Sequence, residues 1–300
     1  MTTIVLSAVA SLLCLVALPE MLHTSRRFDA NPRAGLTIWV AMCTIGWLSA
    51  IILFLKIGLR QFHGPLLHTT ISFVDRLGDG HPLRGLGLSE VVGLSVALDI
   101  TVLLAGGLTF ATWKIWEMRH AQRTVLDLVA ENDEHDEGIS LLRHPQPLAY
   151  YLPGDGGRVV LSTGAIDVLS RRELAAVVSH EEGHRHGRHG ALLIPLQVLS
   201  PFVSFLPVAR YGPEVMRTYL EMSADDYARA RVSAPALRAA LEKSSLFHRP
   251  PRGALGMHDA VVERRLHRLE RGAVPMLDQA TLLGVSGAAL SLFWTLLMVR

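Results

Sequence analysis

The chain has 300 residues, half of them apolar, with a mean hydropathy of +0.31 and a formal net charge of +2. This length allows one large domain or two modest ones, and the apolar fraction favours a membrane protein. The small net charge, carried by basic residues scattered among acidic ones, argues against nucleic acid as a partner. Cys14 and Cys43 both lie in apolar runs, so no disulfide framework is predicted.

Four apolar stretches are long enough to cross a hydrocarbon core, which needs about 20 helical residues. They are Thr3 to Leu22, Leu36 to Leu55, Glu90 to Trp113 and Leu277 to Val299. The first stretch has no Lys or Arg before it and no small-residue cleavage pattern after it, which favours a retained anchor over a signal peptide. We therefore expect a three-span membrane region over 1–116 and a last transmembrane helix over 276–300.

The basic residues of the loops predict the orientation, because Lys and Arg near span ends stay on the cytoplasmic side. Arg26, Arg27 and Arg33 follow the first span, and Lys114, Arg119 and Arg123 follow the third. The loop after the second span is also basic, but it is longer and counts for less. These charges predict an N-terminus outside the cell and a cytoplasmic segment after the third span.

The polar region 117–275 is long enough for a compact catalytic domain. It is interrupted by an apolar insert over 191–209, which contains Pro195, Pro201 and Pro207, and proline disfavours a straight helix. A simple crossing would place His184 and Glu221 on opposite sides of the membrane. If both bind one metal ion, the insert must be a re-entrant hairpin or a helical pair at the membrane surface.

An HExxH motif lies in the segment SRRELAAVVSHEEGHRHG. Ser170 and Glu173 have the spacing of a capping box, which predicts a helix start there. On that helix His180 and His184 are four residues apart, so both imidazoles project from one face. Glu181 is offset around the helix, where its carboxylate can reach a reacting water without being a metal ligand.

Two histidines are too few, because a catalytic zinc usually has three protein ligands. The segment YLEMSADDYARA predicts a second helix with Glu221 and Asp225 four residues apart. Glu221 is the expected third ligand of one zinc ion per chain. Asp225 could accept the free ring N–H of a ligand histidine and fix its tautomer. His186 and His189 are interpreted as the solvated, basic end of the first helix, in preference to a second metal site.

With these residues identified, YYLPGDGGRVVLSTGAIDVLSRRELAAVVSHEEGHRHGRHG and LEMSADDYARA resemble the gluzincin membrane peptidases. The resemblance is closest to the BlaR/MecR type, and HtpX and the CAAX prenyl endopeptidases share the pattern more distantly. It implies a mainly α membrane protein of about four spans, with a cytoplasmic α+β zinc-peptidase domain between the third and last spans, in a bacterial inner (plasma) membrane. It also implies an edge strand near Ala149 and Tyr150 that pairs with the substrate backbone. The extracellular penicillin-binding domain of those sensors has no counterpart before Arg300, so only the protease half is carried over.

The expected reaction is hydrolysis of a peptide bond, in which Glu181 takes the proton of the attacking water and passes it to the leaving amine. The donor that stabilises the oxyanion is left open among His186, His189, Tyr227, His258 and Arg265. The resemblance to BlaR/MecR implies a cytoplasmic or membrane-associated protein substrate, such as a transcriptional repressor. The alternatives are HtpX-like quality control of membrane proteins and a non-proteolytic sensor or scaffold with structural zinc. The lipid bilayer is an expected partner, and a homodimer is left open.

Overall fold

The computed structural model describes residues 2–62, 64–80, 84–132, 139–152, 158–247 and 255–270, and these are mostly helical with one small sheet. The helices are α1 (Thr2–Leu12), α2 (Leu18–Leu22), α3 (Pro32–Gly58), α4 (Leu66–Gly78), α5 (Leu88–Val129), α6 (Thr163–Val168), α7 (Arg171–His186), α8 (His189–Leu199), α9 (Pro207–Arg229), α10 (Ala234–Phe247) and α11 (Leu255–Glu270). The strands are β1 (Ala130–Asn132), β2 (Ile139–Leu142), β3 (Ala149–Leu152) and β4 (Arg158–Ser162). A π-helical turn, Leu13–Ala17, joins α1 to α2, and a 3-10 turn, Ser200–Phe202, follows α8.

Three helical segments are long and apolar enough to cross a membrane: Thr2–Leu22, Pro32–Gly58 and Leu88–Glu117. They coincide with the first three predicted spans, so the expectation of a mainly helical chain with membrane-spanning segments near its N-terminus is confirmed. The predicted last span, Leu277 to Val299, lies outside the described residues. The expected boundary at 116/117 falls inside α5, which continues to Val129, directly before β1.

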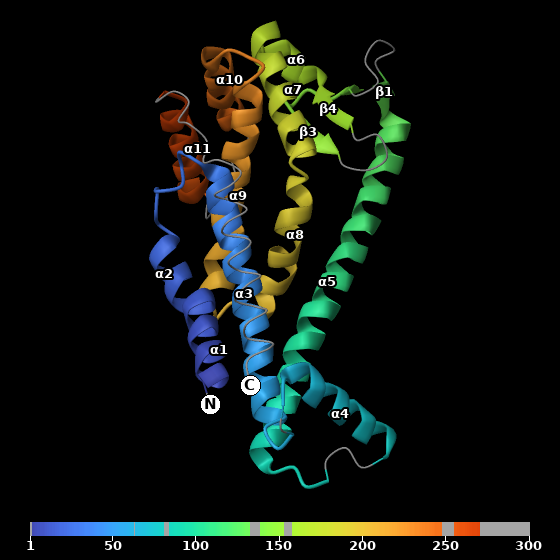
Figure 1. Ribbon diagram of the computed structural model, residues 1–300. Coiled ribbons are helices and arrows are strands. Elements are labelled where there is room, and N and C mark those ends of the chain that lie inside the picture. The colour runs from blue at the N-terminus through green and yellow to red at the C-terminus, as the bar shows by residue number, and fades with distance from the viewer. Residues whose placement is uncertain are drawn as a thin grey trace.

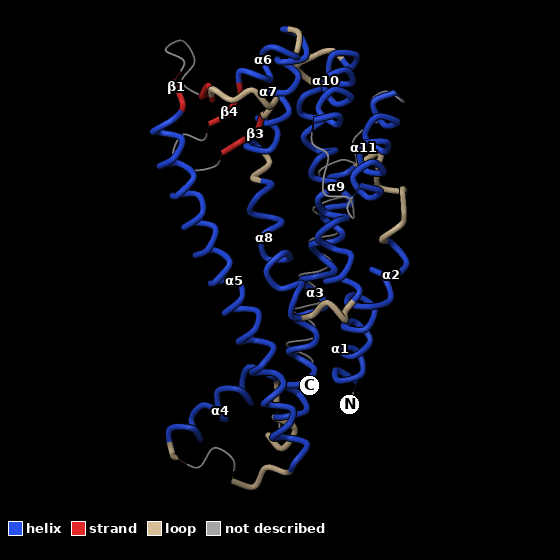
Figure 2. Tube along the Cα trace, turned by 180° about the vertical axis from the view of Figure 1, so that it is seen from behind, coloured by secondary structure: helices blue, strands red, loops and turns tan. Residues whose placement is uncertain are grey.

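The long helices run side by side along the length of the molecule, as Figure 1 shows. The sheet, α6, α10 and α11 gather at one end, and α4 lies across the opposite end. The chain begins towards the α4 end, and Figure 2 shows the same division from behind, with α5 leading from α4 to the sheet. One end therefore carries the predicted peptidase segment, and the helices of spanning length separate it from α4.

The apolar insert forms a hairpin between α7 and the second half of α9. The chain leaves α7 through α8, turns over 200–206 and returns in α9 (Figure 1). Helix α8 packs against α5, and α9 packs against α3. At the second of these contacts Trp39, Met216 and Tyr219 are fully buried. Pro207 lies in the first turn of α9, where the missing amide N–H costs little. The hairpin brings the chain back to the end at which α7 lies.

The sheet has the strand order β1-β2-β4-β3. Strands β2 and β4 are parallel, whereas β1 with β2 and β3 with β4 are antiparallel. Strand β3 is an edge strand, and it packs beside α7. Behind it, Val160 of β4 is fully buried. The sheet therefore presents an open strand edge next to the helix that carries the HExxH motif.

Candidate metal centre

The start of α7 is fixed by the predicted capping box. The Ser170 side chain accepts a hydrogen bond from the Glu173 amide at 3.4 Å, and the Glu173 carboxylate accepts one from the Ser170 amide at 2.7 Å. Lys243 of α10 also pairs with Glu173 at 2.7 Å. Because these contacts set where the helix begins, they also set which side chains face α9 further along α7.

Helices α7 and α9 approach each other closely at Gly183. A Cβ atom at this position would lie 2.9 Å from the Ala224 Cα and 3.1 Å from the Ala224 carbonyl oxygen. Both distances are shorter than an ordinary van der Waals contact, so only glycine permits this packing. The close approach places His180 and His184 of α7 opposite Glu221 of α9.

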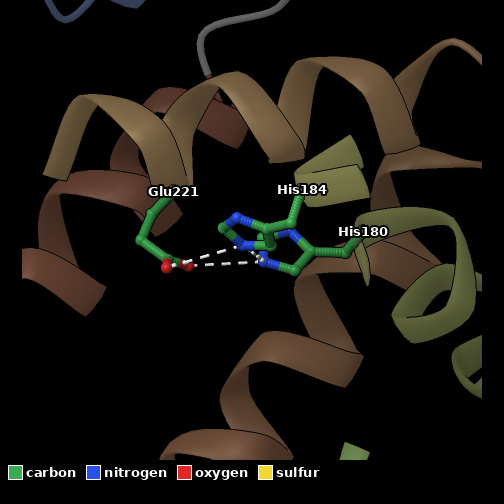
Figure 3. Close-up of side chains that lie close together, drawn as sticks. All are labelled: His180, His184 and Glu221. Atoms are coloured by element: carbon green, nitrogen blue, oxygen red, sulfur yellow. Dashed lines mark hydrogen bonds and ion pairs between the residues drawn. The ribbon is translucent and has the colours of Figure 1, made fainter. Parts of the chain in front are cut away.

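The side chains of His180, His184 and Glu221 converge on one point, as Figure 3 shows. The Nε2 atoms of the two histidines are 3.2 Å apart, and they lie 3.3 and 3.5 Å from the Glu221 carboxylate oxygens. A tetrahedral zinc site with bonds of about 2.0–2.2 Å separates its ligand atoms by roughly 3.3–3.6 Å. The three side chains therefore fit a zinc ion in both ligand type and spacing.

Asp225 and Arg265 lie behind the ligand group. Asp225 is 1% exposed, and its Oδ1 lies 3.0 Å from His180 Nδ1, although the ring N–H does not point squarely at it. Arg265 of α11 donates two hydrogen bonds of 2.8 Å to the Asp225 carboxylate, and its Nη1 lies 3.1 Å from Glu221 Oε2. One guanidinium group thus holds the carboxylates of both Glu221 and Asp225. Three of its N–H groups are directed to these carboxylates.

The charges of this group shift the titration of its members. Although burial acts in the opposite direction, the positive charge of Arg265 lowers the pKa values of Glu221 and Asp225. Burial also opposes the charge on His180, but contacts with Asp225 and Glu221 outweigh it and raise the His180 pKa to about 9. Burial raises the pKa of Glu181 above its ordinary value, against the opposing effect of the two histidines. The carboxylates of Glu221 and Asp225 are therefore ionised at neutral pH.

The edge strand β3 contacts Glu181 directly, because the Tyr151 amide donates a hydrogen bond of 2.9 Å to its carboxylate. Leu148 and Ser162 are hydrogen-bonded just before β3, and such pairs alternate along an antiparallel ladder. Tyr150 therefore bonds towards β4, whereas the backbone groups of Ala149 and Tyr151 point to the open edge. Of the two edge-strand residues predicted from the resemblance, Ala149 alone presents its backbone there, and Tyr151 is the second such residue.

His189 is placed differently from the solvated helix end expected from the sequence. The residue is 7% exposed, and its Nδ1 lies 2.9 Å from the Nδ1 of His184. Burial, with the neighbouring His184, lowers the His189 pKa to about 4. The interpretation as a solvated residue was wrong because α7 ends at His186 and the left-handed Arg188 interrupts the helix before α8 begins at His189. A glycine at position 187 was the available sequence signal for that helix end.

The remaining candidates for the oxyanion donor either lie apart from the metal-site side chains or have side chains outside the described residues. The ring of Tyr227 lies beside His186 and under the guanidinium of Arg231. His258 belongs to α11, but its side chain lies outside the described residues. Sequence reasoning therefore named Arg265 and Asp225, but it missed the hydrogen bond of Tyr151 to Glu181 and the contact of His189 with His184.

Comparison with protein families finds a similarity for the middle of the chain. Residues 116–241 match the model of peptidase family M48. This segment contains the sheet and the three converging side chains, and it is similar to the metallopeptidases of that family. Searches of the curated proteins and of the solved structures gave no significant match.

Proposed function

We propose that this protein is a membrane-embedded, zinc-dependent endopeptidase with His180, His184 and Glu221 as metal ligands. The convergence of these three side chains within 3.5 Å of one another is the observation that carries the proposal. The match to peptidase family M48 and the three helices of spanning length support the class of enzyme and its place in a membrane. Within the described residues the group contains three ligands, and a structural zinc more often has four.

Zinc in this site would supply Lewis-acid chemistry, polarising the scissile carbonyl and allowing water to ionise near neutral pH. Glu181 is proposed to take the proton of the attacking water and to deliver it to the leaving amine. Its raised pKa suits this role, because a general base works best when its pKa approaches the working pH. The Tyr151 amide holds the Glu181 carboxylate in place beside the open strand edge.

We propose that the substrate binds as an extended strand beside β3. Ala149 directs its backbone N–H and C=O to the open edge, and Tyr151 directs its C=O there, because its N–H donates to Glu181. An added strand can pair with such groups. Pairing through the backbone positions a peptide bond with little demand on its sequence. Selection of the substrate would then depend on which extended segments can reach β3 next to the membrane.

The peptidase segment is proposed to lie in the cytoplasm of a bacterial cell. The basic loop after the first span supports this side, and in the structure it contacts α11, where Arg268 donates to the Asp29 carbonyl oxygen at 2.6 Å. The substrate would be a cytoplasmic or membrane-associated protein. The resemblance to BlaR/MecR supports a transcriptional repressor, whereas HtpX-like quality control predicts many damaged membrane proteins.

The proposed chemistry is tested with the full chain purified in detergent and supplied with a candidate substrate. Glu181→Gln should keep zinc but lose at least about 100-fold in cleavage, because it removes the general base. Glu182→Gln is the matched control, since it changes the same charge one residue further along α7. Retained cleavage by zinc-loaded Glu181→Gln would contradict the role of Glu181. A wild-type protein that binds no zinc would contradict the proposed metal centre.

The substrate class is tested by trapping in cells that carry Glu181→Gln. A single small regulator held by this variant would support the signalling role. A broad set of misfolded membrane proteins would support quality control instead. Proteins that bind equally well to wild type would not be substrates, because the active form releases its products.

A further inference from the structure

The junction between α7 and α8 places the side chain of His189 against the metal-binding helix. Arg188 has a φ of 48°, the only positive φ of a non-glycine residue within the described part of the chain. Gly187 leaves room for the returning ring, because a Cβ there would lie 2.1 Å from His189 Nε2. The left-handed Arg188 interrupts the helix between α7 and α8, so His189 does not take the position that an uninterrupted helix would give it. This interruption places the buried imidazole of His189 against His184, one of the proposed metal ligands.

The contact between His189 and His184 has a defined hydrogen-bond direction. Their Nδ1 atoms are 2.9 Å apart, and the two rings stand at 90°. Two ring nitrogens at this distance need one donor and one acceptor. The Nε2 of His184 faces Glu221 and His180, so a neutral His184 that offers this atom to a metal carries its proton on Nδ1. His189 Nδ1 is then the acceptor.

We propose that His189 is a positioning residue that fixes the ring orientation and the tautomer of His184. This inference rests on the proposed zinc centre and adds a function for the Gly187–Arg188–His189 turn. His180 receives its support from the carboxylate of Asp225, whereas His184 receives it from a neutral imidazole. The two proposed zinc ligands on α7 are therefore held by side chains of different charge.

The test compares zinc affinity, measured by competition with a chelator, for the full chain in detergent. His189→Leu fills similar space without an acceptor and should weaken zinc binding about 10- to 100-fold. His189→Asn offers its Oδ1 near the position of the ring Nδ1 and should restore most of that loss. His186→Leu is the matched control, because His186 is an exposed histidine at the end of α7, three residues before His189.

The outcomes separate this inference from the proposed function. Zinc affinity of His189→Leu equal to wild type would overturn the positioning role while leaving the zinc centre intact. Equal weakening in His189→Leu and His189→Asn would also overturn it, because ring packing and not hydrogen bonding would then be responsible. Failure of the wild type to bind zinc would instead contradict the proposed function. Melting temperatures of the metal-free variants verify that each one is folded.

A second, independent observation concerns α4, which lies between two helices of spanning length. Its buried residues Leu66 and Thr69 face the protein, and Leu66 packs with Ile52 and Leu59 from the end of α3. The helix runs across the direction of α3 and α5 at the end opposite the sheet (Figures 1 and 2). Because the candidate spans end at Gly58 and resume at Leu88, α4 lies at the level where the membrane surface is expected.

Beside its packed face, α4 presents an uncovered apolar stripe. Leu67, Ile71 and Val74 are 55%, 55% and 54% exposed, and they follow one another at helical spacing. His68, Ser72 and Asp75 occupy the polar side. An amphipathic helix of this kind lies in the interface with its apolar face among the lipid chains. We infer that the stripe Leu67–Ile71–Val74 is embedded in the membrane surface opposite the peptidase end.

Site-directed spin labelling tests this inference in lipid vesicles, after Cys14 and Cys43 are replaced by alanine. A nitroxide at Ile71→Cys should collide more with oxygen and less with a water-soluble nickel chelate than one at Asp75→Cys, the control on the polar face. Equal accessibility to nickel at both positions would overturn lipid contact. Low accessibility to both reagents at Ile71 would also overturn it, because another protein surface would then cover the stripe.

Discussion

His180 and His184 lie one turn apart on α7, yet the protein holds them in different ways. Behind His180 lies a charged network, in which Asp225 and Arg265 are almost completely enclosed. Behind His184 lies the neutral ring of His189. A buried charge that loses its partner is strongly destabilising, whereas the loss of one hydrogen bond between neutral groups costs much less. Substitutions in the charged network behind His180 should therefore change stability and its pH dependence. Substitutions of His189, behind His184, should mainly change the geometry of the metal site.

The largest expected effect comes from Asp225→Asn, which keeps the shape of the side chain and removes its charge. Arg265 and His180 then lose a buried counter-charge, so we expect the free energy of unfolding to fall by about 3–5 kcal/mol. Zinc affinity should also fall about 10- to 100-fold. Chemical denaturation of the metal-free protein and chelator competition measure the two effects. If Asp225→Asn were as stable as wild type, the proposed contrast between the charged support of His180 and the neutral support of His184 would be wrong.

The next largest effect is expected in how the stability of the metal-free protein depends on pH. A pKa of about 9 for His180, above the ordinary value of 6.5, means that protonation favours the folded state. This contribution is fully present below pH of about 6.5 and is lost as the pH rises through about 9, with a total of up to roughly 3 kcal/mol. Melting temperatures in the presence of a chelator should fall across this window. The decline should persist in His189→Leu and become smaller in Asp225→Asn, where Glu221 still faces His180. An unchanged decline in Asp225→Asn together with a smaller one in His189→Leu would contradict the proposed difference between the two histidines.

Local spacing predicted the parts of this site that a regular helix defines. His180, Glu181, His184, Glu221 and Asp225 all follow from the periodicity of α7 and α9, and the hairpin of α8 and α9 brings these helices together. His189 could not be placed in this way, because its position depends on one left-handed residue after the helix end. Arg265 reaches Asp225 across 40 residues, and no local pattern encodes such a contact. The edge strand was predicted, but its outward residues depend on register, and a shift of one residue reverses every side.

An intermediate effect is expected from Gly183→Ala, which should displace both His180 and His184. The new methyl group would meet the Ala224 backbone at 2.9 Å, so α7 must move away from α9. Overpacking of this kind costs about 1–3 kcal/mol of stability. Because both histidines move relative to Glu221, zinc affinity should fall together with stability. Unchanged zinc affinity in a destabilised Gly183→Ala protein would show that the ligand group adjusts independently of the helix spacing.

The smallest effect is expected from Lys243→Met, at the far end of α7 from both histidines. Lys243 pairs with Glu173, but its side chain is 38% exposed, and pairs of this kind contribute less than about 1 kcal/mol. The capping box between Ser170 and Glu173 remains in this variant, so the start of α7 and the direction of its side chains should not change. Zinc affinity should therefore equal that of wild type. A loss of zinc affinity as large as that of His189→Leu would mean that Lys243 of α10 helps to set the direction of the α7 side chains. The position of His184 would then depend on more than its contact with His189.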